Sequence, residues 1–264
     1  EAIETGKREL VEALPADGWA ILNADDERVR RMAGHTAAGV RSYGFADDAD
    51  VRATNVVSLG TEGMRFTLDV DGETYEVNTP VLGRHGVHNA LAAVAVADRA
   101  GMDIADVITG LARPLQMPHR SQLVTAGPWR VLDDSYNASP DAVLAALDLL
   151  AELPGRPLAV LGEMLELGES AQAEHRRVGR YAATVTDHLV VVGEGARDVV
   201  DGAIDGGLDP ARVHLVADRD EALATLLGQL QDGDSVLVKA SRGAALDLLV
   251  ERLVLAGETG KGTA

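Results

Sequence analysis

The sequence predicts an α/β protein built in two parts, a mixed region followed by a regular α/β unit. After residue 140, short apolar runs alternate with segments of helical periodicity, whereas before it strands and helices follow each other in uneven order. Strands that are apolar throughout and alternate with helices indicate a parallel sheet covered on both faces. The length of 264 residues fits two domains of roughly 150 residues each.

Composition narrows the classes of partner. Hydrophobic residues make up 46% of the chain but aromatic residues only 3%, so the cores must be built from Ala, Val and Leu. Asp and Glu number 42 against 24 Lys and Arg, and the net charge of −18 disfavours nucleic acid and anionic membranes as partners. Cysteine is absent, which excludes disulfides and thiolate metal sites. Together with the lack of an apolar run of about 20 residues, this leads us to expect a cytoplasmic protein. We also expect it to be a monomer.

Apolar periodicity and turn residues divide the first region into helices and short strands. The expected helices span 1–14, 27–33, 90–100 and 104–111. The expected strands span 19–22, 40–45, 51–59, 64–70 and 74–78, followed by a hairpin whose second strand, 129–132, ends at Asp133. The pair Asp71-Gly72 between two of these strands is a strong signal for a two-residue hairpin turn.

The second region repeats one unit, a short apolar strand followed by a helix. The expected strands span 158–161, 189–192, 213–216 and 235–239. The expected helices span 142–152, 170–184, 196–204, 219–230 and 244–255. This rhythm predicts the parallel sheet.

The stretch 133–141, DDSYNASPD, connects the two regions. It follows the strand 129–132 and leads into the helix 142–152, with Ser139 suited to the N-cap and Pro140 to the first helical position. Open α/β folds place ligand contacts at the carboxyl ends of strands, although an ordinary polar strand-to-helix loop remains an alternative. We expect a hinge here, with domains at 1–137 and 138–256 and a disordered Gly/Thr-rich tail at 257–264.

Three polar residues of the chain have the chemistry of a nucleotide site. The amide of Asn89 can donate to and accept from an adenine edge, and the planar fork of Arg120 suits phosphate oxygens. Asp134 can accept hydrogen bonds from two ribose hydroxyls. Taken singly, each also fits a structural role: a capping Asn, a solvated Arg and a turn Asp.

Two further segments follow expected strands of the second region. Segment 162–168 carries two carboxylates, and segment 239–243 contains Lys239, Ser241 and Arg242 before an expected helix. A helix N-terminus with these side chains favours anions, although solvated loops explain both segments equally well. The sequence contains no phosphate-loop lysine motif.

Together these segments resemble the Mur ligases. The matching stretches run in the family's order along the whole chain, at 23–26, 83–92, 118–120, 133–140, 161–168, 175–179 and 239–242. The combination of DDSYN at 133–137 with GEMLELG at 162–168 is most similar to the members that join D-Ala-D-Ala to UDP-N-acetylmuramoyl-tripeptide.

The resemblance implies a fold and a reaction. The chain would be the later part of a mixed-sheet ATP-binding domain followed by a Rossmann-like C-terminal ligase domain. The UDP-binding domain and the phosphate loop would lie upstream of Glu1. The family uses ATP and Mg²⁺ to convert the tripeptide carboxylate into an acyl phosphate, which the amine of D-Ala-D-Ala attacks. Residues 1–264 alone are then expected to be inactive, because they lack the phosphate loop.

The resemblance also assigns roles to single residues. Asn89 would contact adenine, Arg120 the phosphates and Asp134 the ribose, with Tyr136 and Asn137 beside the nucleotide at the hinge.

Lys7 matches a lysine that many members carbamylate to hold a second magnesium ion, and Lys239, Ser241 and Arg242 would face the reaction. Two alternatives remain open. A folylpolyglutamate-synthase-like ligase shares the architecture, but the DDSYN stretch argues against it. A non-catalytic nucleotide-binding module is disfavoured because all three nucleotide-contacting residue types are retained together.

Overall fold

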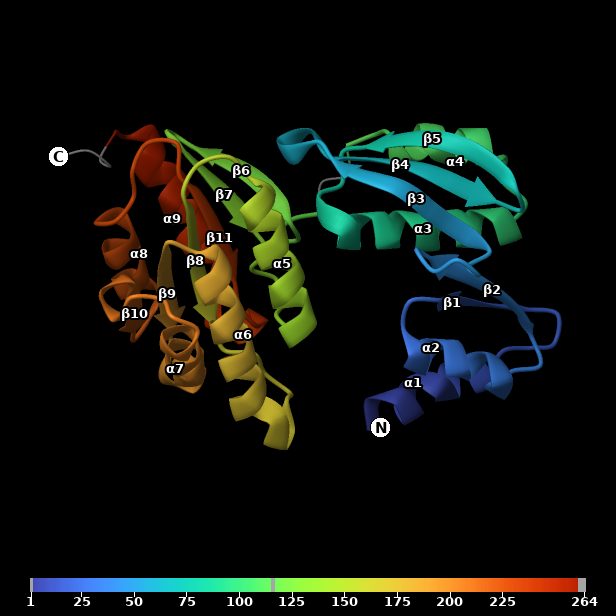
Figure 1. Cartoon of the computed structure of the whole chain (residues 1–264), viewed down its shortest axis with the longest axis horizontal. Coiled ribbons are helices and arrows are strands. Elements are labelled where there is room, and N and C mark those ends of the chain that lie inside the picture. Colours follow the sequence, from blue (N-terminus) through green and yellow to red (C-terminus); the bar gives the residue numbers. More distant parts are fainter. Residues whose placement is uncertain (1, 115–116, 261–264) are drawn as a thin grey trace. The chain divides into compact units, whose positions relative to one another are not determined.

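The computed structural model describes residues 2–114 and 117–260, which form two compact units, Glu1–Leu115 and Gln116–Ala264 (Figure 1). The division therefore falls before the expected boundary at 137/138. The cause is strand pairing: β6 (Gln122–Ala126) pairs with β7 (Trp129–Asp133), and β7 pairs with β11 (Ser235–Lys239). These pairings place the predicted hairpin that ends at Asp133 in the sheet of the second unit.

The first unit contains a mixed five-stranded sheet of order β1-β2-β3-β4-β5. Its strands are β1 (Trp19–Asn23), β2 (Gly39–Gly44), β3 (Val51–Ser58), β4 (Met64–Val70) and β5 (Glu73–Thr79). The first three are parallel and the last two antiparallel to their neighbours, as the uneven order of elements predicted. Asp71 and Gly72 join β4 to β5 with φ of 54° and 85°, which confirms the predicted tight hairpin.

The helices of this unit are α1 (Ala2–Glu12), α2 (Glu27–Arg31), α3 (Gly83–Arg99) and α4 (Ile104–Leu111). Helix α3 starts at Gly83, not at the expected residue 90. Val87, Leu91 and Val94 recur at helical spacing and are fully buried in one cluster with strands β3 to β5. A Cβ at Gly86 would approach the Val81 side chain to 3.0 Å, so this glycine serves close packing within the helix instead of a turn.

The second unit contains a six-stranded sheet of order β10-β9-β8-β11-β7-β6. The remaining strands are β8 (Pro157–Gly162), β9 (His188–Val192) and β10 (Val213–Val216). The helices are α5 (Pro140–Glu152), α6 (Ala171–Val185), α7 (Arg197–Asp205), α8 (Arg219–Leu227) and α9 (Asp247–Glu258). All neighbours are parallel except the edge pair β6–β7, which confirms the predicted parallel α/β unit.

Helices cover both faces of this sheet (Figure 1). On one face α6 packs between α5 and α7, and on the other α8 packs against α9, which also contacts β6 and β7. Strands β8, β9 and β11 contribute Leu158, Val190 and Val236 to the core, where each is at most 1% exposed. Burying such a side chain stabilises the fold by about 1.5–3 kcal/mol. The core is mainly aliphatic, with Trp129 also buried in it.

The end of the chain differs from the prediction in two ways. The helix expected at 244–255 is a 3₁₀ turn, Arg242–Ala244, followed by α9, because Ala245 adopts a left-handed conformation with φ of 47°. The tail expected to be disordered from 257 continues α9 to Glu258. Gly257 packs so closely that a Cβ would lie 2.3 Å from the Ala126 carbonyl oxygen. Residues 261–264 of that expected tail lie outside the described residues.

Within the described ranges, no helix is long and apolar enough to cross a membrane.

Candidate ligand site at the carboxyl edge of the parallel sheet

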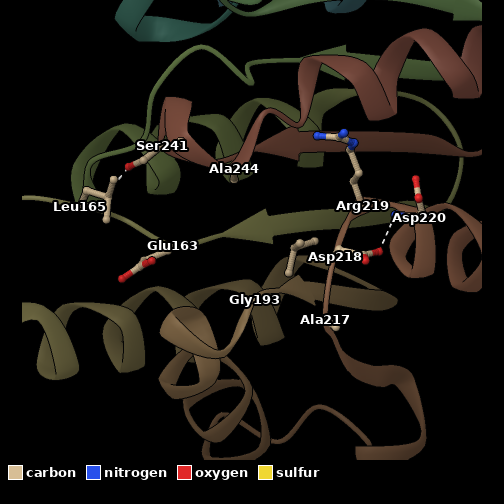
Figure 2. A pocket seen from close by; sticks show the side chains of 11 residues that line it. Glu163, Leu165, Gly193, Ala217, Asp218, Arg219, Asp220, Ser241 and Ala244 are labelled. Carbon is tan, nitrogen blue, oxygen red and sulfur yellow. Dashed lines mark hydrogen bonds between the residues drawn. The ribbon is translucent and has the colours of Figure 1, made fainter.

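The second unit contains a pocket of about 560 Å³ where four parallel strands end. It is lined by Glu163 and Leu165 after β8, Val192 and Gly193 at the end of β9, residues 217–220 after β10, and Ser241, Gly243 and Ala244 after β11 (Figure 2). The chain leaves β8 toward β9 on one side and returns from β10 to β11 on the other. Such a switch in strand order is where open α/β sheets bind ligands.

Two hydrogen bonds hold the loop after β8 against its surroundings. The Met164 N–H donates to Nε2 of His175 at 3.0 Å, and Nδ1 of His175 lies 2.7 Å from the Ala171 carbonyl oxygen. Nε2 accepts a hydrogen bond and therefore has no proton. Nδ1 faces a carbonyl, which only accepts, so Nδ1 carries the proton. This buried imidazole is therefore neutral. The Leu165 N–H donates to Oγ of Ser241 at 3.0 Å (Figure 2). Ser241, which the sequence analysis expects to face the reaction, therefore connects the loop after β11 to the loop after β8.

Glu163 supplies an exposed carboxylate to the pocket. This carboxylate lies against Gly195, where a Cβ would come within 2.5 to 2.6 Å of its atoms. No ion pair of Glu163 occurs among the described residues. The Glu163 carboxylate can occupy this position because residue 195 is a glycine; any larger side chain would displace it.

The loop after β10 completes the charged lining. Asp218 caps α8 by accepting from the N–H groups of Asp220 and Glu221 at 2.9 and 3.0 Å, and Asp220 pairs with Arg252. Arg219 is the cationic residue of the pocket lining. A guanidinium and a free carboxylate in one small pocket suit a ligand that carries both an ammonium and a carboxylate group.

Asp134, the expected ribose ligand, is engaged inside the protein. Its Oδ1 accepts from the Ser121 N–H at 2.9 Å, and its Oδ2 accepts from Nζ of Lys239. Lys239 is 3% exposed and also donates to the Asn137 carbonyl oxygen at 2.9 Å. The register pairs Val238 with Asp133, which brings Lys239 next to Asp134. Lys239 therefore joins the ends of β11 and β7.

Asp133 has a separate set of partners. It is 2% exposed, and its Oδ1 accepts from the N–H and Oγ of Ser135 at 3.1 and 2.6 Å. Its Oδ2 lies 2.8 Å from Nδ1 of His119. Two adjacent carboxylates repel each other unless each has compensating donors. Here Lys239 neutralises Asp134, while His119 and Ser135 satisfy Asp133.

Arg120 and Arg242 meet at one aromatic ring. Their guanidinium carbons lie 4.2 and 5.1 Å from the ring centroid of Tyr136. Both arginines are exposed, and in the described part of the chain neither forms an ion pair. The structure thus brings together five of the predicted site residues, namely Arg120, Asp134, Tyr136, Lys239 and Arg242, in the second unit.

The other predicted residues are placed as follows. Asn137 accepts from the Ala138 N–H with its side chain at 2.9 Å. Asn89 lies exposed in the second turn of α3, and Lys7 lies exposed on α1, both in the first unit. Across residues 2–114 and 117–260, no group of three His, Asp or Glu side chains is arranged to hold a metal ion.

Sequence reasoning missed two parts of this site. His119 is not among the candidate residues of the sequence analysis, because its contact with Asp133 joins positions 14 residues apart. The loop 217–220 was not singled out, although Asp218 followed three positions later by Glu221 is a helix-start signal directly after a strand. A capping pattern at the carboxyl end of a parallel strand could have drawn attention to it.

A mainly parallel open sheet with a charged pocket at its carboxyl edge is the arrangement typical of a ligand-binding α/β domain. Residues 1–97 match the model of the Mur ligase middle domain, and residues 119–242 match that of the Mur ligase glutamate ligase domain. The chain belongs to the Mur ligase family.

Named relatives and solved structures support this assignment. The chain is 42% identical to UDP-N-acetylmuramoyl-tripeptide–D-alanyl-D-alanine ligase of Mycobacterium tuberculosis H37Rv over 277 residues, which covers 96% of the chain and 54% of that protein. A crystal structure of MurF from Acinetobacter baumannii superposes with a TM-score of 0.86 at 28% identity, covering 96% of the chain and 55% of that structure. The chain thus spans about half the length of the relatives it matches.

A more distant neighbour is the folylpolyglutamate synthase of Mycobacterium tuberculosis, with a TM-score of 0.71 at 21% identity, covering 94% of the chain and 59% of that structure. This likeness shows a shared fold only.

Proposed function

We propose that the protein carrying this chain is an ATP-dependent ligase of peptidoglycan precursor synthesis that joins D-Ala-D-Ala to UDP-N-acetylmuramoyl-tripeptide through an acyl phosphate. The 42% identity to a relative of that name supports the proposal. The joint presence of Asn89, Arg120 and Asp134 supports it further, because these residues match the family's nucleotide contacts. We further propose that this protein acts as a monomer in the cytoplasm.

One feature of the second unit carries the proposal, the loop between β11 and α9. Ser241 lines the pocket, and the next residue, Arg242, lies over the Tyr136 ring that Arg120 also contacts. The same loop therefore borders both a pocket suited to a zwitterion and a pair of cations suited to phosphate. Amide formation requires the amine site and the phosphate site to be close together, because the incoming amine must reach a carboxyl group that carries a phosphoryl group.

The described residues of the second unit fit the phosphate and ribose groups of an adenine nucleotide. Arg120 and Arg242 offer guanidinium groups without ion-pair partners among the described residues, and such groups bind phosphate oxygens in bidentate fashion. Each carboxylate oxygen of Asp134 accepts one hydrogen bond within the protein and keeps a further lone pair that can accept from a ribose hydroxyl. Asn89 remains the proposed adenine contact, with Tyr136 and Asn137 beside the nucleotide. ATP supplies the phosphoryl group that activates the tripeptide carboxylate.

Magnesium does not fit the described residues in the same way, since they present no group of three ligands for a metal ion. Lys7 is a proposed metal ligand only when it is carbamylated. No step of the mechanism is assigned to the metal.

The pocket is the proposed place of the incoming dipeptide. Its ammonium group would lie toward Glu163 and its carboxylate toward Arg219, because opposite charges attract more strongly where water is partly excluded. Ser241 holds the loop that carries Glu163, and Lys239 holds β11 to β7, so both act by fixing the geometry of the site.

The test measures phosphate release by the whole protein with ATP, magnesium and UDP-N-acetylmuramoyl-tripeptide. We expect turnover that depends on D-Ala-D-Ala and is not supported by glutamate in its place. Turnover with glutamate and a folate acceptor would favour the folylpolyglutamate-synthase-like alternative. Nucleotide binding without turnover under any of these conditions would favour a non-catalytic module.

A further inference from the structure

Tyr136 is in contact with two cations that come from separate loops. Arg120 precedes β6 and Arg242 follows β11, whereas Tyr136 lies between β7 and α5. The guanidinium carbon of Arg120 lies 4.2 Å from the centroid of the Tyr136 ring, and that of Arg242 lies 5.1 Å from it. Because both distances are to the same centroid, the two guanidinium carbons lie no more than about 9 Å apart, a separation that one diphosphate can bridge by accepting hydrogen bonds from both.

No counter-charge for this arrangement is found in residues 2–114 and 117–260. Arg120 and Arg242 form no ion pair with any described residue, and the neighbouring carboxylate of Asp134 is already paired with Lys239. Elsewhere the protein neutralises closely placed charges, as where Arg41 pairs with Asp71 and Asp98. Two guanidinium groups held together repel each other, and a bound polyanion removes that repulsion.

The backbone around Arg120 is also held in place. His119 and Ser121, on either side of it, have φ of 61° and 46°, which non-glycine residues adopt only when their surroundings impose it. Asp133 holds the ring of His119, and Asp134 holds the N–H of Ser121.

The Tyr136 N–H closes this turn by donating to the His119 carbonyl oxygen at 3.0 Å. The same residue thus fixes the turn with its backbone and receives the Arg120 side chain with its ring. Tyr136 is 37% exposed, and both arginines are also exposed and so accessible to a ligand.

We propose that Tyr136 is a positioning residue whose ring holds Arg120 and Arg242 as a pair that binds one polyanion of the pyrophosphate class. This deepens the proposed function, on which it rests for its biological ligand, since it makes Arg242 a second contact for the phosphate chain. The ring acts through cation–π attraction to both guanidinium groups, and the hydroxyl group is dispensable.

The experiment titrates inorganic pyrophosphate into the 264-residue chain by isothermal calorimetry at low ionic strength. Tyr136→Leu removes the ring that holds both arginines and should weaken binding about 5- to 30-fold, the combined strength of two exposed cation–π contacts. Tyr136→Phe keeps the ring and should stay within about 2-fold of the wild type. Arg120→Gln and Arg242→Gln should each weaken binding roughly 10-fold or more, as expected for a lost charge-assisted contact. Arg180→Gln, an exposed arginine on α6, is the charge-matched control and should have little effect.

The decisive comparison uses the background in which both Arg120 and Arg242 are replaced by Gln. There Tyr136→Leu should have no further effect on pyrophosphate binding. A ring that instead stacks on a nucleotide base would leave pyrophosphate binding unchanged in Tyr136→Leu and weaken adenosine binding, which would overturn the proposal.

Two other outcomes also overturn it: no pyrophosphate binding by the wild type, or failure of Tyr136→Phe to retain affinity. Thermal unfolding midpoints of the variants show whether a loss of fold contributes. The titration needs neither turnover nor dipeptide, so a failed ligase assay would not change how its result is interpreted.

Discussion

Nδ1 of His119 lies 2.8 Å from Oδ2 of Asp133, and this contact joins the turn that carries Arg120 to the end of β7. The carboxylate is almost fully buried, while the imidazole is about one-third exposed. His119 therefore acts on the proposed phosphate contact through the backbone of its neighbour.

The first prediction concerns this contact. In the whole protein, His119→Ala should raise the KM for ATP about 10-fold with a smaller change in kcat, because a hydrogen bond to a charged group is worth about 1.5–3 kcal/mol. His119→Asn retains a donor and should recover part of the loss. Steady-state kinetics with varied ATP measure both effects. An unchanged KM in His119→Ala would show that the turn keeps its conformation without Asp133.

The second prediction concerns the buried pair of Asp134 and Lys239. Asp134→Ala leaves Lys239, which is 3% exposed, without its counter-charge. Removing one partner of a buried pair costs about 3–5 kcal/mol of unfolding free energy. Urea unfolding should show this loss, and the double variant Asp134→Ala/Lys239→Met should lose less than the sum of the single variants. Additive losses would indicate that the two groups do not interact.

The expected loss of stability in Asp134→Ala affects how its activity should be interpreted. A fall in ATP use by Asp134→Ala would combine lost ribose contact with lost stability. Arg120→Ala, at an exposed position, should weaken ATP use without a comparable loss of stability, and so it is the cleaner test of the nucleotide site.

The third prediction concerns Gly195. A Cβ there would lie 2.5 to 2.6 Å from the carboxylate of Glu163, the flexible end of a side chain that can move away. Gly195→Ala should therefore cost little stability but raise the KM for D-Ala-D-Ala several-fold, in the same direction as Glu163→Gln. Dipeptide kinetics together with thermal unfolding check both parts. A normal KM for the dipeptide in both variants would remove Glu163 from the proposed binding site.

The fourth prediction uses a glycine whose neighbour cannot move. A Cβ at Gly202 of α7 would lie 2.2 Å from the Arg176 carbonyl oxygen of α6. Gly202→Ala should force these two helices apart and cost about 1–3 kcal/mol of unfolding free energy, as overpacking does. Chemical denaturation of the variant measures that loss. If Gly202→Ala unfolds like the wild type, the close approach of α6 and α7 is not a constraint.

The fifth prediction concerns pH and the first unit. Asp25 accepts from the N–H groups of Phe45 and Ala46 and lies 2.5 Å from Nε2 of His88. Burial raises the pKa of Asp25, but these backbone donors and His88 outweigh it, so the net pKa falls below its ordinary value of 3.8. A carboxyl with a depressed pKa stabilises the fold above its unfolded pKa, and that stability is lost as pH falls through the folded pKa.

Asp25→Asn should therefore be less stable than the wild type at pH 7, and the difference should shrink below about pH 3.8. Urea unfolding at pH 7, 5 and 3 measures it. A difference that stays constant down to pH 3 would contradict the role given to the ionised carboxylate.

The sequence by itself determined the elements and the candidate residues of this protein. Repeated apolar strands and helices after residue 140 predicted the parallel sheet, and Asp71-Gly72 predicted the β4–β5 hairpin, because both signals are local in the chain. Only the tertiary structure decided where the units divide and what each side chain contacts. The division precedes β6 because β7 pairs with β11, a strand about a hundred residues later. Asp134 and Lys239, 105 residues apart, become partners for the same reason. Contacts of this kind depend on the order of strands in the sheet, which local patterns of the sequence do not specify.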